Sequence, residues 1–302
     1  MTTFRAKLST PILQTLLPVA ILAILAGGIA HQAGFLAEAP ATAQLFRPQT
    51  VTIAPRTFSY REDGEFLRAN YVIDAPMRTV TETRPMTIMK HQVSLSEYTA
   101  CVSEGACSAP VGASYDLGNV PVTGVNYDDA RAYARWLSDK TGELWTLPTD
   151  RQLAFAAGKS FPDDAFGLDD DGSNPAIRWL ADYRREAAER SKRDPVPRVL
   201  GSFGENEYGL SDFGGNVWEW TGTCHRRVML DKDNTVLRNE NACGVYVTVG
   251  NHRSPMTSFF RDPKGGGCAV GTPPDNLGFR LVKSTAWYAP LVKALRDRGI
   301  DL

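Results

Sequence analysis

The stretch that decides the fold is Gly209-Leu210-Ser211-Asp212-Phe213-Gly214-Gly215-Asn216-Val217-Trp218-Glu219-Trp220-Thr221. Its adjacent glycines favour positive φ, which predicts a tight turn here rather than the start of a regular helix or strand. The side chains of Asp212 and Glu219, with the backbone carbonyls between them, would form an oxygen set suited to calcium. The alternative is a purely structural turn, with both tryptophans in the core and Glu219 paired with an arginine.

The composition around this stretch is that of an ordinary globular protein. The chain has 302 residues, of which 22% are charged and 43% hydrophobic. These values exclude collagen-like, disordered and polytopic membrane proteins. The formal net charge of −1 offers no bulk attraction for a polyanion, so nucleic acid is excluded as the expected partner.

The N-terminal segment predicts export. Ile12–Ala30 is uncharged and, at 1.5 Å per helical residue, reaches about 28 Å, close to one bilayer core. Arg5 and Lys7 precede it, and the next basic residue is Arg47, which predicts an N-terminus in the cytoplasm. We expect residues 1–33 to be a single-pass anchor that spans the inner membrane and holds the rest of the chain on its periplasmic side. A cleaved signal peptide, releasing the protein to the periplasm, is the alternative.

The remaining chain is predicted to be one α+β domain with much irregular structure. Residues 34–56 are read as a linker, 57–284 as the domain and 285–302 as a tail helix. Periodicity and capping residues predict four strands, at Thr57–Tyr60, Glu65–Arg68, Arg78–Thr83 and Met86–Met89, and three helices, at Ser94–Val102, Tyr127–Lys140 and from Thr149 to about Ala157. Residues 161–174 and 231–241 are predicted to be polar loops.

The five cysteines all follow the apolar segment. Cys101 and Cys107 flank a short turn and are expected to form a disulfide, as export would allow. Cys224 and Cys243 bracket 18 residues and are the second candidate pair. Cys268 is then odd, and is either a free thiol or the true partner of one of the second pair.

Four ordered motifs resemble those of the formylglycine-generating, sulfatase-modifying-factor family. They are Pro121–Ala130, Leu147–Asp150, Gly209–Thr221 and Asn276–Arg280. The resemblance covers residues 57–284 and implies a compact C-type-lectin-like domain. It also implies that Asp212, Gly215, Val217 and Glu219 are a structural calcium site. A further calcium site near Asp182 and Tyr183 has no convincing downstream carboxylate.

The resemblance fails at the catalytic residues of the family. Oxidases of this kind hold copper(I) with two cysteines flanking a His-Arg-Ser, here His252-Arg253-Ser254. The two thiolate positions fall on or near Asn251 and Met256, which cannot supply anionic sulfur. The iron-binding His-x-x-x-His-x-Glu triad of the wider superfamily is also missing from the sequence. Whether the chain is an enzyme is therefore left open.

The region from His252 to Gly267 is a candidate for either metal binding or binding of a peptide or anionic group. His252 and Met256, spaced i, i+4, are a candidate copper(I) pair, against the simpler reading in which Met256 packs and His252 is a hydrogen-bonded loop residue. Arg253, Arg261 and Lys264, beside Gly265–Gly267, form either a floor for a peptide or anionic group, or a solvated turn. The candidate pocket is thus His252, Arg253, Ser254 and Met256.

Three functions remain open. The run from Cys243 to Arg280 resembles the branch associated with nitrite-reductase and other denitrification clusters, which implies an accessory or maturation factor whose partner is a client polypeptide or a periplasmic metalloenzyme. The second hypothesis is an active oxidase or non-haem metal enzyme with unusual ligands. The third is a non-catalytic, lectin-like binding module.

Overall fold

The first sheet joins the two ends of the folded chain. The computed structural model describes residues 47–112, 119–165, 196–263, 276–286 and 288–296, with a few positions between 176 and 187 and at 298 and 300. Strand β1 (Thr50–Ile53) pairs antiparallel with β6 (Met86–Met89), followed by β12 (Val282–Lys283) and β7 (Trp145–Thr146). Because β1 lies in the predicted linker 34–56, the ordered fold starts before residue 57.

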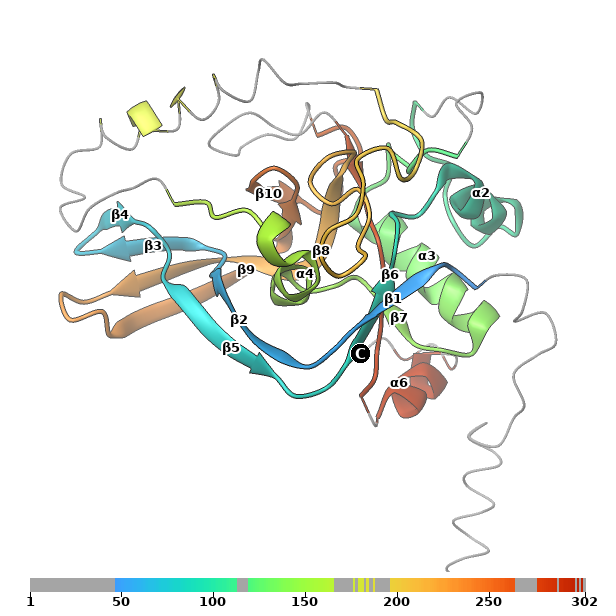
Figure 1. The fold of residues 1–302 in the computed structure, drawn as a ribbon, viewed down its shortest axis with the longest axis horizontal. Helices are drawn as coiled ribbons and strands as arrows, with labels where there is room; N and C mark the ends of the chain where they lie inside the picture. The colour runs from blue at the N-terminus through green and yellow to red at the C-terminus, as the bar shows by residue number, and fades with distance from the viewer. Residues whose placement is uncertain are drawn as a thin grey trace, which may run out of the picture.

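The second sheet is built on a long hairpin. Strands β8 (Trp218–Leu230) and β9 (Val236–Val249) pair antiparallel. The sheet order is β10 (Arg253–Thr257), β9, β8, β3 (Glu65–Arg68) and β4 (Tyr71–Ile73), and β11 (Leu277–Gly278) lies parallel to the start of β8. The hairpin projects away from three helices, α2 (Leu95–Ser103), α3 (Tyr127–Thr141) and α6 (Ala289–Arg296) (Figure 1).

Two sequence predictions for this hairpin are wrong. Residues 231–241 are not simply a polar loop, because only Asp231–Thr235 turns the chain and β9 begins at Val236. The glycine pair also does not prevent a strand from starting, since β8 begins at Trp218, three residues after Gly215. The polar residues of β9 are exposed strand positions, and pairing with β8 satisfies their backbone groups without burying their side chains.

A two-stranded ribbon connects the sheets. Strand β2 (Arg56–Arg61) pairs antiparallel with β5 (Met77–Glu82). These strands lie within a residue or two of the predictions, and β3 and β6 have the predicted bounds. The Asp63-Gly64 turn and the prolines between the strands predicted these bounds from the sequence.

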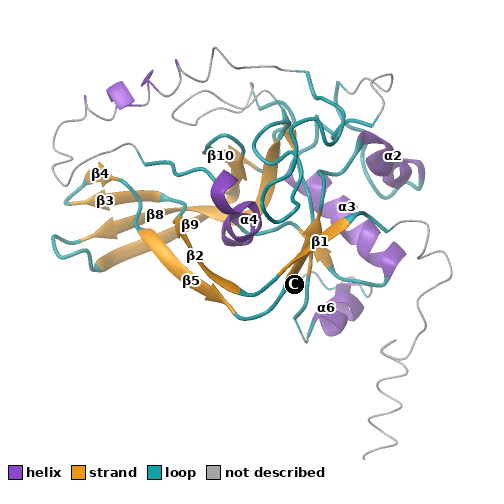
Figure 2. Ribbon diagram, in the orientation of Figure 1, coloured by secondary structure: helices purple, strands orange, loops and turns teal. Residues whose placement is uncertain are grey.

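The helices begin where their capping residues predict. Helix α2 (Leu95–Ser103), α3 (Tyr127–Thr141) and α4 (Asp150–Ala157) each start after a capping box, at Ser94, Asn126 and Thr149. Gly142, at φ 70°, ends α3 in the left-handed conformation. A 3₁₀ turn (Gly158–Ser160) follows α4, and α6 (Ala289–Arg296) is the predicted tail helix. Figure 2 shows α2, α3 and α6 gathered around the four-stranded sheet.

The predicted anchor lies outside the described residues, as does Asp182. Within the described residues, no helix is long and apolar enough to cross a bilayer.

The main core lies between α2, α3 and the start of β8. Trp220, Tyr98, Tyr133 and Phe279 are all fully buried there. The indole Nε1 of Trp220 donates to the Val125 carbonyl at 3.1 Å, so its polar atom is satisfied inside the core. A second cluster packs α4 against β6 and β9, and a third lies under the hairpin.

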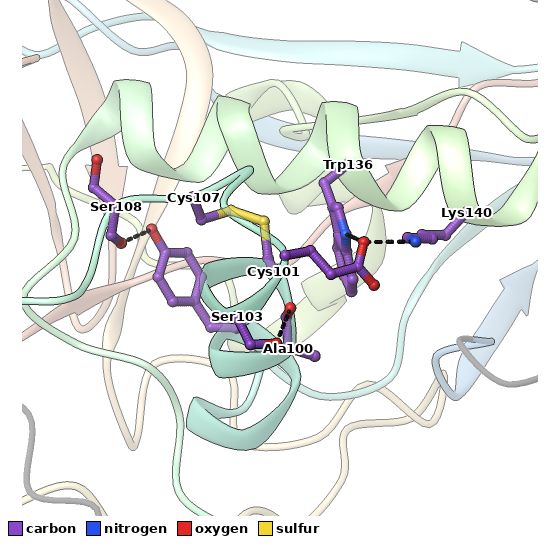
Figure 3. The surroundings of a disulfide bond; sticks show 9 residues. Ala100, Cys101, Ser103, Cys107, Ser108, Trp136 and Lys140 are labelled. Carbon is purple, nitrogen blue, oxygen red and sulfur yellow. Dashed lines mark hydrogen bonds and ion pairs between the residues drawn. A yellow bond between two sulfur atoms is a disulfide. The ribbon is translucent and has the colours of Figure 1, made fainter.

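Both predicted disulfides are present. Cys101–Cys107 closes six residues at the end of α2, and Cys224–Cys243 links β8 to β9. Figure 3 shows the first bond beside α3, which carries Trp136 and Lys140. Trp136 Nε1 donates to the carboxylate of Glu104 at 3.0 Å, and Lys140 pairs with the same carboxylate at 2.6 Å. Cys268 lies outside the described residues.

We expect one free thiol per chain in protein denatured without reductant. Four cysteines are consumed by the two bonds, which leaves Cys268. A thiol-reactive dye read by absorbance would measure this number, and Cys268→Ser should reduce it to zero. A count of three or five would contradict the pairing.

Candidate functional site

A buried ion pair lies at the centre of the fold-deciding stretch. Glu219 on β8 and Arg280 after β11 are both fully buried, and both guanidinium bonds to the carboxylate are 2.6 Å. Arg280 also donates to the carbonyls of Lys90 and Ser211 at 2.9 Å. Gln92 Nε2 adds a third donor to Glu219 at 2.9 Å. Such charge-assisted, two-pronged pairing fixes both side chains.

Asp212 is held by the backbone of a neighbouring loop. Its carboxylate accepts the amide of Gly201 at 2.5 Å and that of Phe203 at 2.9 Å. The residue is buried and has a φ of 60°, a conformation that aspartate tolerates better than most side chains. His91 Nδ1 lies 3.6 Å from the same carboxylate. Asp212 thus stabilises the turn.

These contacts match the alternative reading of the motif, in which Glu219 pairs with an arginine. All four carboxylate oxygens of Asp212 and Glu219 already accept hydrogen bonds. Arg280 also neutralises one of the two negative charges that would attract a cation. In this arrangement Asp212 and Glu219 do not fit the predicted calcium cage with Gly215 and Val217.

Calcium binding remains testable by thermal unfolding. Because the carboxylates have their donors, we expect the melting temperature to be the same in millimolar calcium and in chelator. Differential scanning fluorimetry under both conditions measures this. A saturable rise that disappears in Asp212→Asn would instead restore the calcium site.

The four sequence motifs converge on β8. Trp220 reaches the Val125 carbonyl of the first motif. The amide of Gly222 donates to the carbonyl of Pro148, in the second motif, at 2.9 Å. Arg280 supplies the link to the fourth motif. The sequence identified all four motifs but not Gln92, because a single glutamine outside the motifs does not indicate that it contacts Glu219.

His252 and Met256 do not form a copper pair. Met256 is fully buried in the main core, whereas His252 packs edge-on against Trp218 with ring centroids 4.4 Å apart. Along extended backbone, four residues span roughly 13 Å, too far for one metal ion to join two ligands about 2 Å from it. Gly250 is required beside them, because a Cβ there would overlap the Trp218 ring. Ser254 is buried, and its carbonyl accepts from Thr248 at 3.0 Å.

Arg253 lies in a buried cluster of carboxylates rather than on a solvated turn. Its Nε donates to Asp164 at 2.5 Å, and its Nη1 donates to Asp150 at 3.2 Å and to the Arg61 carbonyl at 2.7 Å. Its side chain is only 6% exposed. Burial raises the pKa of Asp150 to about 7 and that of Asp63 to about 6, against the opposing effect of Arg253.

The predicted basic floor is not assembled. Arg253 is committed to this cluster, and Arg261 makes a bidentate pair with Asp129 at 2.7 Å and 2.8 Å. Lys264 and Gly265–Gly267 lie outside the described residues. Asp63 and Asp164 were not singled out from sequence, because nothing in their local pattern marks them as partners of Arg253.

The fold and these convergent motifs define a mixed α/β domain of the formylglycine-generating type. Residues 36–285 match the family described as the sulfatase-modifying factor enzyme 1-like domain, and the chain belongs to this family.

The relatives include proteins named as formylglycine-generating enzymes and proteins named as inactive. The inactive C-alpha-formylglycine-generating enzyme 2 of Bos taurus is 29% identical over 161 residues, 53% of this chain and 49% of the relative. The formylglycine-generating enzyme of Mycobacterium tuberculosis is 36% identical over 132 residues, 39% of this chain and 40% of the relative. The chain thus matches about half, or less, of the length of these relatives.

A solved structure shares the fold. PvdO from Pseudomonas aeruginosa superposes with a TM-score of 0.50 at 20% identity, covering 78% of this chain and 94% of PvdO. At this identity the likeness shows the fold alone.

Proposed function

We propose that this chain is an exported, membrane-anchored member of the family that binds a client polypeptide without oxidising it. It would act as an accessory or maturation factor for a periplasmic metalloenzyme such as nitrite reductase. One observation carries the proposal: the family's thiolate positions fall on or near Asn251 and Met256, neither of which is a cysteine, and the four cysteines that the structure describes are all in disulfides.

Chemistry explains why this loss silences the oxidase. Copper(I) is a soft ion whose oxidase site needs anionic sulfur. Met256 offers only a neutral thioether, and that thioether is packed in the core. In the described residues, no group of three or more His, Cys, Asp or Glu side chains is arranged to hold a metal.

Two further observations support the proposal. The disulfides suit an oxidising compartment, in agreement with the predicted export. The similarity to a mammalian protein named as inactive agrees with a scaffold retained without its reaction. The link to nitrite reductase rests on the sequence resemblance of residues 243–280 to the denitrification-associated branch.

The oxidase arm of the test uses the purified chain loaded with copper(I). The chain and the His252→Ala variant are incubated with oxygen and a cysteine-containing peptide, and aldehyde formation is followed by mass spectrometry. We expect no aldehyde and much less than one copper per chain. About one copper per chain, lost in His252→Ala and accompanied by aldehyde, would contradict the proposal and favour an oxidase with unusual ligands.

The partner arm uses the native membrane. Crosslinking followed by affinity purification from denitrifying cells should recover one metalloenzyme, and deletion of the chain should lower the metal content of that enzyme. Calcium-dependent binding to a glycan array, with no protein client recovered, would favour the lectin-like alternative instead.

A further inference from the structure

A pocket beside the Arg253 cluster is lined by carboxylates that lack a hydrogen-bond donor. Its volume is about 360 Å³, and its lining includes Tyr60, Asp63, Asp150, Arg226 and Cys224. It lies where the β2–β3 turn, the start of α4 and the β8–β9 hairpin meet. The Cys224–Cys243 bond ties the two hairpin strands together beside it.

Two carboxylate oxygens of this pocket lack a hydrogen-bond donor. Asp150 is 3% exposed; its Oδ2 accepts from Arg253, whereas its Oδ1 accepts from no group. Asp63 Oδ2 is likewise buried without a donor. A buried acceptor left unsatisfied is costly, and more so when it is charged. Such atoms, in residues that line a pocket, indicate that a donor is missing.

The two arginines that line the pocket, Arg151 and Arg226, and the neighbouring Arg253 are already paired with other groups. Arg226 donates to the Asp63 carbonyl at 2.9 Å and pairs with Glu62 at 3.2 Å. Arg151 pairs with Glu82 at 2.6 Å. Arg253 is shared among Asp164, Asp150 and the Arg61 carbonyl.

The local charge is therefore unbalanced. Four carboxylates (Asp63, Asp150, Asp164 and Glu62) face the three guanidiniums of Arg253, Arg226 and Arg78, which leaves an excess of one negative charge. An excess of negative charge in a low-dielectric site attracts a cation strongly.

We propose that this pocket binds a protonated primary amine, with the ammonium group between Asp63 and Asp150. An ammonium has three donors on a compact centre and can serve two carboxylates from different elements. A guanidinium is a flat fork suited to one carboxylate face. The Tyr60 ring and the disulfide offer an apolar wall to a short alkyl stem, as in a lysine side chain. The proposal is independent of the client-binding function, since a small amine suffices as ligand.

The experiment uses isothermal titration of the whole purified chain near pH 8. The probes are Nα-acetyl-lysine N-methylamide, which has a side-chain ammonium, and alanine N-methylamide, which has an α-ammonium. The norleucine analogue of the first probe is the neutral control. We expect one of the two ammonium probes to bind with one site per chain and the norleucine analogue not to bind. The α-amine is only about half protonated near pH 8, whereas the lysine amine is fully protonated. The affinity of each probe is therefore expressed per protonated amine, and the tighter one identifies the source as a lysine side chain or a chain terminus.

The variants are Asp63→Asn and Asp150→Asn, which keep shape and remove charge. Each should weaken amine binding about tenfold or more, because a charge-assisted acceptor is lost. Asp163→Asn is the matched control, since that side chain is 61% exposed, pairs with Arg61 and does not line the pocket. Near-UV circular dichroism establishes that each variant is folded.

If a variant does not fold, the pH dependence of amine binding by the wild-type chain still tests the proposal. Amine affinity should fall as pH is lowered from about 8 to about 5, because protonation neutralises Asp63 and Asp150. Absence of binding by either ammonium, equal binding of the norleucine analogue, or affinity unchanged in both Asn variants would overturn the proposal. So would saturable binding of calcium or magnesium that excludes the amine.

Discussion

Replacing Glu219 with alanine is expected to lower the free energy of unfolding by about 3–5 kcal/mol, since it leaves a buried charge uncompensated. Arg280 is fully buried and would keep only carbonyl partners. For a domain of this size, the loss corresponds to roughly 6–20 °C in melting temperature. Chemical denaturation followed by tryptophan fluorescence measures it.

The matched control for this change is Glu65→Ala. Glu65 also pairs with an arginine, Arg227, at 2.7 Å, but the Arg227 side chain is 60% exposed. Exposed pairs contribute about 0–1 kcal/mol. Equal losses of unfolding free energy in the two variants would contradict the prediction, because they would mean that burial of the Glu219–Arg280 pair does not determine how much its removal destabilises the fold.

Replacing Arg253 with methionine is the second change with a large expected effect. Methionine keeps the stem but removes the cation facing Asp63, Asp150 and Asp164. We expect a loss of about 3–5 kcal/mol near pH 8, because the carboxylates are then buried without compensation.

The loss from Arg253→Met should be smaller near pH 5. Asp150 and Asp63 have folded-state pKa values of about 7 and about 6, above their ordinary value of 3.8. Between the ordinary and the folded-state pKa of each group, the folded chain binds more protons than the unfolded chain. Their contribution to stability therefore falls as pH rises from about 4 to about 7, and is unaffected below that window. Without Arg253, which lowers both pKa values, the fall should extend to higher pH.

Denaturation curves of both proteins at about pH 5, 6.5 and 8 test this sign. Arg151→Met is the control, because Arg151 pairs with Glu82 at the surface, with 46% of its own side chain exposed. A loss that grows towards pH 5 would contradict the assignment of raised pKa values to the cluster.

Local features of the fold could be predicted because their causes are local. The capping boxes at Ser94, Asn126 and Thr149 depend on residues three positions apart, and each helix starts where its cap predicts. The Cys101–Cys107 bond likewise spans only six residues. The β8–β9 hairpin was missed because polar residues on an exposed strand resemble a loop until the pairing partner is known.

The candidate site was predictable only in part. His252, Arg253 and Ser254 follow one another in sequence and lie at the start of β10, but they have separate surroundings. His252 packs on Trp218, whereas Arg253 reaches Asp150 and Asp164, and alternate strand residues point to opposite sides. The i, i+4 spacing that suggested a metal pair has this meaning on a helix, not on a strand.

The sequence by itself determined the family, the helix starts and the Cys101–Cys107 pair, because these depend on residue order and short spacing, whereas the structure was needed to pair Cys224 with Cys243. Only the tertiary structure decided that Glu219 pairs with Arg280 and that Arg253 is surrounded by carboxylates from three other segments. The state of a buried charge depends on which groups surround it in space, and those groups come from positions 61 to 192 residues away along this chain. No local sequence pattern therefore predicts which groups surround Arg253 or Arg280.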